Sequence, residues 1–157
     1  MFWKQRHRDT ADGIARELYD WGVGQPITSD ETLGLDFGAT SACARELRLY
    51  QFAALSLALV KTEKGDPSLV PVREGIEKRF YTDATLSADE VRAAMSDLSA
   101  LLWPERDPRG VVWGHAWYES VGLNERDPTR LTRFSTMWFH FFTAAEKSLK
   151  QDEIVEG

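Results

Sequence analysis

The sequence predicts an all-α protein, a single compact bundle of five to seven helices around a central apolar helix. Apolar residues recur at helical steps of three and four through most of the chain, and no long alternating run of β-branched residues marks a strand. Residues 40–64 include a stretch that is apolar around the whole helix, as expected of a helix packed by neighbours on all sides. The length of 157 residues corresponds to one domain.

The first helix is predicted from a stripe of apolar and half-polar residues that ends at Trp21. The N-cap is either Asp9 or Thr10, because both side chains accept hydrogen bonds from a first turn. Residues 1–8 would then form a basic tail. Glycines follow Trp21 and end the helix. The stripe contains Trp3, His7, Ala11, Ile14, Leu18 and Trp21.

Residues 22–38 form the least regular stretch, with four glycines and one proline. A structureless loop of about 17 residues is uncommon in a compact domain. We expect one short helical turn capped by Ser29. Two interpretations stay open, a structural loop and a functional lid.

The central helix of residues 40–64 ends before Pro67, because proline cannot continue the backbone ladder. A shorter helix is predicted over residues 71–81, where apolar residues recur at steps of four. The next helix has the clearest start, since Ser87 and Glu90 form a capping box before a clean apolar stripe.

The last two helices share one start signal, because Asp107 and Asp127 each precede a proline. Aspartate at the N-cap and proline at the first helical position are both favoured. We therefore expect helices over residues 108–121 and 128–150. The polar tail of residues 151–157 is expected to fray.

Composition limits the classes of function. The 25 acidic and 19 basic side chains give a net charge of −6, which argues against binding along a nucleic-acid backbone. The single cysteine, Cys43, excludes an internal disulfide and a metal site built on several thiolates. Phe52–Val60 is far shorter than the roughly 20 residues of a membrane span, and no signal peptide is recognised. We expect a cytoplasmic protein.

A search for chemistry finds no convergent catalytic set and no cofactor motif. His115 and Glu119 lie four residues apart on one helix face, so both could reach one metal ion if a third ligand were present. His140 is a poor third ligand, because it points about 180° away from the core face of its helix. A metal-dependent helical enzyme using His115 and Glu119 is therefore the least favoured alternative.

The feature above background is an excess of aromatic residues, with six tryptophans and eight phenylalanines concentrated late in the chain. On the last helix, Met137 lies about 120° to one side of the core arc and Phe139 about 80° to the other. Either this helix is buried on several sides, or part of its flank is an exposed apolar patch.

We therefore expect a non-enzymatic interaction or regulatory module that presents an aromatic patch on its last two helices. Its partner would be another protein or a second copy in a homodimer. The alternative is a carrier or sensor of an apolar small molecule held between helices, with the same aromatics turned inward. The expected anchors are Trp113, Trp117, Met137 and Phe139.

Overall fold

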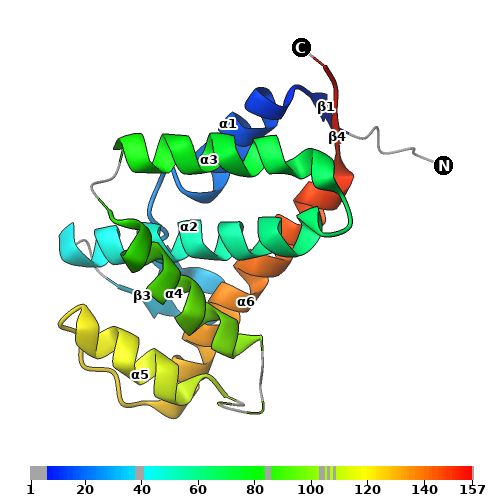
Figure 1. The fold of residues 1–157 in the computed structure, drawn as a ribbon. Coiled ribbons are helices and arrows are strands. Elements are labelled where there is room, and N and C mark those ends of the chain that lie inside the picture. Colours follow the sequence, from blue (N-terminus) through cyan, green and yellow to red (C-terminus); the bar gives the residue numbers. More distant parts are fainter. Residues whose placement is uncertain are drawn as a thin grey trace.

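The computed structural model describes residues 7–37, 41–83, 86–102, 105, 107 and 109–156, which form an all-α bundle (Figure 1). Within these residues there are six α-helices, so the predicted fold class is confirmed. The helices are α1 (Ala11–Gly22), α2 (Ser41–Glu63), α3 (Val70–Asp83), α4 (Ala88–Leu101), α5 (Val111–Ser120) and α6 (Pro128–Gln151). The shorter elements are the 3₁₀ helices η1 (Glu31–Leu33) and η2 (Pro67–Leu69) and the strands β1 (His7–Asp9), β2 (Ser29–Asp30), β3 (Leu35–Asp36) and β4 (Asp152–Ile154).

Helix α2 is the centre of the bundle, as its apolar circumference predicts. It packs mainly against α4 and α6, and α3 lies along it on another side (Figure 1). Phe52 in the middle of α2 stacks face to face on Phe80 of α3, with ring centroids 3.9 Å apart. Because α2 has neighbours on several sides, its apolar residues are distributed around the helix and are not confined to one face. The buried side chains of its second half include Phe52, Ala53, Ala54, Leu55, Ala58 and Leu59.

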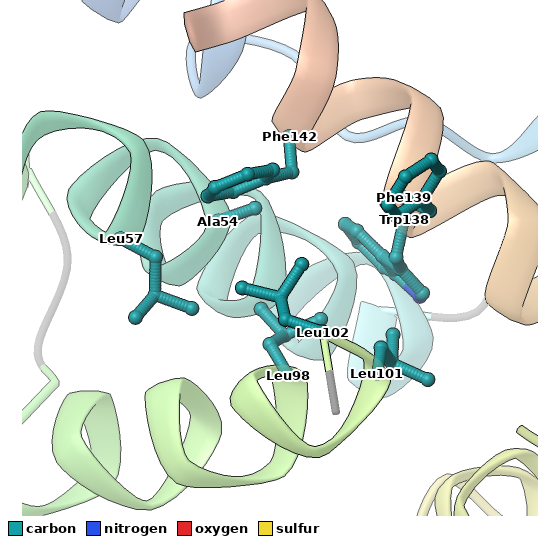
Figure 2. Close-up of a pocket in the computed structure, with 8 residues that line it drawn as sticks. All are labelled: Ala54, Leu57, Leu98, Leu101, Leu102, Trp138, Phe139 and Phe142. Atoms are coloured by element: carbon teal, nitrogen blue, oxygen red, sulfur yellow. The ribbon is translucent and has the colours of Figure 1, made fainter. Parts of the chain in front are cut away.

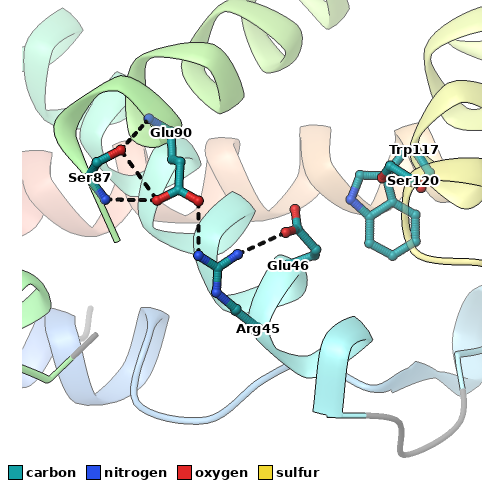
Figure 3. A network of polar contacts seen from close by, with 6 residues as sticks. All are labelled: Arg45, Glu46, Ser87, Glu90, Trp117 and Ser120. Carbon is teal, nitrogen blue, oxygen red and sulfur yellow. Dashed lines mark hydrogen bonds and ion pairs between the residues drawn. The ribbon is translucent and has the colours of Figure 1, made fainter. Parts of the chain in front are cut away.

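Three of the predicted helix starts are confirmed by their hydrogen bonds. The Thr10 side chain caps α1, and Asp127 caps α6 by accepting from the N–H of Thr129. The capping box of α4 is complete, because the Ser87 hydroxyl and the Glu90 carboxylate each accept from the other's backbone N–H (Figure 3). Arg45 of α2 also donates to Glu90 at 2.9 Å, so the cap ties α4 to α2.

The start of α5 differs from the prediction. The helix begins at Val111, and Gly110 occupies its N-cap in the left-handed conformation without a side-chain cap. Asp107 lies outside the helix but still satisfies a backbone donor of its first turn, because its Oδ2 accepts from the N–H of Trp113 at 3.0 Å. The predicted Pro108 start lies outside the described residues.

The two ends of the chain pair with each other, which the sequence analysis misses. Strands β1 and β4 run parallel, with His7 opposite Asp152. Arg8 donates to Glu153 across the pair at 3.0 Å. The tail expected to fray is therefore paired over residues 152–154, because α6 returns the chain to the start of α1 (Figure 1). Residues 1–6 of the predicted basic tail lie outside the described residues.

The loop after α1 is held to the core by Gln51 of α2, a residue with no exposed surface. Its Nε2 donates to the carbonyls of Gly22 and Gln25, and its Oε1 accepts from the N–H of Ile27. Further on, β2 and β3 form a short hairpin around η1. The cap of η1 is Asp30 rather than the predicted Ser29. These contacts hold the loop against α2.

We expect Gln51→Leu to lower the free energy of unfolding by about 2 kcal/mol, because one buried and two partly buried backbone hydrogen bonds would be lost. Gln151→Leu is the matched control, since this glutamine is exposed at the end of α6 and should change stability little. Urea denaturation of the three proteins measures the difference. Equal stabilities for the Gln51 variant and the wild type would contradict the loop's dependence on this side chain.

Candidate interaction surface

An apolar groove lies on the surface between α2, α4 and α6 (Figure 2). Among the residues that the structure describes, no charged side chain lines it. Its volume of about 10 Å³ is that of a shallow hollow with room for about one water molecule. The groove can therefore be covered by an apolar surface, but it cannot enclose a ligand. The lining residues are Ala54, Leu57, Leu98, Leu101, Leu102, Trp138, Phe139 and Phe142.

Phe139 stands at the edge of this groove with 48% of its surface exposed. The other phenylalanine and tryptophan rings of α6 are buried, so Phe139 alone among them faces solvent. Figure 2 shows its ring beside Trp138 on α6, across the groove from Leu101 and Leu102. The helical arithmetic places both Phe139 and Met137 outside the core arc and leaves open which of them is exposed.

A second, more polar pocket of about 160 Å³ adjoins the groove and shares Leu101 and Phe139 with it. One wall is the start of α5, where the Ser135 hydroxyl of α6 donates to the carbonyl of Gly110 at 3.0 Å. Arg109 also lines this pocket and is exposed. Phe139 is thus the point at which an apolar groove meets a polar hollow.

Lysine side chains gather at the other end of the groove. The Lys61 Nζ lies 5.6 Å from the centre of the Phe142 ring and 2.7 Å from Glu146 Oε2. Lys150 approaches the second oxygen of Glu146 at 3.2 Å. The hydrogen bond from Lys61 is the largest reason that the pKa of Glu146 lies below its usual range.

The four residues expected to anchor a partner do not form one surface. Trp117 and Met137 are buried, at 2% and 4% exposure. Trp113 is partly buried and stacks on Phe134, with ring centroids 5.1 Å apart. Phe139 is the exposed member of the set, so the candidate surface is the flank of α6 that faces α4.

Met137 is buried because another segment covers its side of α6. Arg133 lies one turn before Met137 and reaches the carbonyl of Leu33 in η1. The η1 and β3 segments both contact α6. The opposite flank, with Phe139, has no such cover among the described residues.

The pair expected to hold a metal lies on the exposed side of α5. His115 Nδ1 is 3.9 Å from Glu119 Oε1; the Glu119 side chain is largely exposed and that of His115 is partly buried. His115 lines an open depression of about 460 Å³ together with Val112 and Arg126. Within the described part of the chain, no group of three histidine, cysteine or acidic side chains is placed to share an ion.

No pattern in the sequence marks the leucines of the groove, or the lysines at its end, as part of a surface site. Leu57, Leu101 and Leu102 belong to apolar stripes that the sequence assigns to the core. Nothing in the sequence shows that they meet Phe139, because that depends on how α4 crosses α6. The partial burial of Leu57 and Leu101 follows from the same crossing.

A scan against protein-family models, a search of curated proteins and a search of solved structures each found no match. In the residues that the structure describes, no helix combines the length and apolar character needed to cross a bilayer. A function for this chain therefore has to be inferred from the groove and its surroundings.

Proposed function

We propose that this chain is a non-enzymatic interaction module, whose protein partner docks on the groove between α2, α4 and α6. The observation that carries the proposal is the half-exposed ring of Phe139 beside a groove whose described lining residues are all apolar. Exposed apolar patches with polar rims are typical of interaction sites, and aromatic residues are enriched at their centres. Phe139 would be the central anchor.

The alternative, a carrier of an apolar small molecule, has less support. Small-molecule sites usually offer roughly 300–1,000 Å³ and bury most of the ligand. The groove offers about 10 Å³, and the larger hollows are open to solvent and partly polar. A macromolecular surface that covers the groove from outside fits its shape better.

The test is a comparison of Phe139→Glu with the wild type. Proteins captured from a cell extract on each immobilised form are quantified by mass spectrometry, and each candidate partner is then purified and titrated by calorimetry. We expect the Glu variant to weaken binding at least tenfold, about 1.4 kcal/mol, because it places a charge in the centre of an apolar contact.

Val112→Glu is the matched control, since Val112 is 74% exposed on α5 and lies outside the groove. It makes the same kind of change to an exposed apolar residue. The proposal fails if every purified partner binds all three proteins with equal affinity, or if the control weakens binding as much as Phe139→Glu does.

A further inference from the structure

Resting on this proposed function, we infer that the partner presents an amphipathic helix with acidic residues along its flanks. Its apolar face would cover the groove at Phe139, and its carboxylates would meet the basic side chains at the groove ends. Three features of the described residues support this occupant: the backbone of the groove walls, the length of the flank and the charge around it.

The walls of the groove favour a helix over an extended segment. The lining residues lie within α2, α4 and α6 or directly after α4, where backbone groups bond within their own helix. An extended peptide would find no ladder of free N–H and C=O groups there. A helix brings its own backbone hydrogen bonds and needs only an apolar groove, as in other helix-in-groove complexes.

The open flank of α6 is long enough for such a helix. Its outward side runs from Thr132, which lines the polar pocket, to Lys150, which pairs with Glu146. At 1.5 Å per residue this distance is about 27 Å, which matches a partner helix of about five turns. Phe139 lies near the middle of this length.

The charges around the groove favour an acidic partner. Among the described residues, three basic side chains lie at its ends, two with Phe142 and Glu146 and one in the polar pocket. The acidic side chains at the same places are Glu146, which two lysines approach, and Asp107, which accepts from the α5 backbone. The basic side chains are Lys61, Lys150 and Arg109.

This local excess of positive charge contrasts with the net charge of −6 for the whole chain. Helix α6 itself carries four basic residues and one acidic residue, Glu146. Opposite charges across an interface accelerate association and select among partners. A second copy of this chain would bring an equally basic rim and the same negative net charge, so it is the weaker candidate.

The probe for this inference is a displayed library of a stable three-helix scaffold, in which the outer face of one helix is randomised. The wild-type protein is the target, and binders to Phe139→Glu are removed beforehand. We expect enriched helices with an apolar stripe and more Asp and Glu than the starting library. Their affinity should fall as salt is raised, because the ion pairs lie at an exposed rim.

Charge reversal then tests the rim itself. Lys150→Glu should weaken a purified acidic binder roughly fivefold, because an attractive pair becomes repulsive. Lys78→Glu makes the same charge change on α3, outside the groove, and should leave the affinity within about twofold. Thermal melting of both variants verifies that the fold is intact.

The outcomes separate this inference from the proposed function. Binders that depend on Phe139 but are neutral or basic would overturn the acidic helix and leave the docking groove standing. A library that yields no binder would also overturn the inference. The capture experiment would still test whether a protein partner docks on the groove. A Phe139-dependent dimer seen by light scattering would overturn the acidic helix as the occupant of the groove and identify a second copy of the chain instead.

Discussion

Replacing Phe134 with alanine should lower the free energy of unfolding by about 4 kcal/mol. Phe134 has no exposed surface and lies at the centre of the aromatic cluster between α2, α5 and α6. Removing its ring leaves a cavity whose walls are other large rings, which cannot collapse readily into the space. The rings around it are those of Phe37, Trp113, Trp117, Tyr118 and Trp138, at centroid distances of 4.6 to 6.0 Å.

Phe139→Ala is the matched control for this prediction. It removes the same ring from the same helix, five residues later, at a site that is 48% exposed. We expect a loss of less than about 1 kcal/mol, since little buried area is removed. Chemical denaturation of both variants gives the comparison, and similar losses for the two would show that Phe139 contributes to the core.

Phe134 and Phe139 represent the two environments of the aromatic residues in the last helix, the core and the surface. Most of the rings late in the chain fill the core, including Trp117 and Trp138. The excess is therefore mainly structural, and it does not by itself indicate a broad exposed patch. The proposed interaction surface depends instead on one ring that the helical period places outside the core arc.

The sequence predicts the features that depend on near neighbours in the chain. The capping box of Ser87 and Glu90 and the cap of Asp127 involve residues two or three positions apart, so their geometry follows from local preference. The central position of α2 follows from its apolar circumference. The exposure of His140 follows from the same helical period.

Features that depend on distant segments could not be predicted in this way. The pairing of β1 with β4 joins residues 145 positions apart, and each strand has only three residues. Met137 is buried because η1 and β3 cover its flank, which no periodicity reveals. The groove itself requires α4 to cross α6 at Phe139.

Gly110→Ala should lower the free energy of unfolding by about 3 kcal/mol, through two effects that add at this position. Gly110 has a φ of 63°, which disfavours alanine by roughly 1–2 kcal/mol. A Cβ would also overlap the Cβ and Oγ of Ser135 on α6. Because the Ser135 Cβ is fixed to the α6 backbone, the start of α5 would have to move away from α6.

Gly122→Ala separates these two effects. Gly122 has a φ of 77°, but a Cβ there would meet nothing within 4 Å. It should therefore cost only the backbone strain, roughly 1–2 kcal/mol. Urea denaturation of both variants measures the difference, and equal losses would show that α5 does not depend on close contact with Ser135. A larger loss at Gly110 would show that the close approach of α5 to Ser135 stabilises the fold at the wall of the polar pocket, which both residues line.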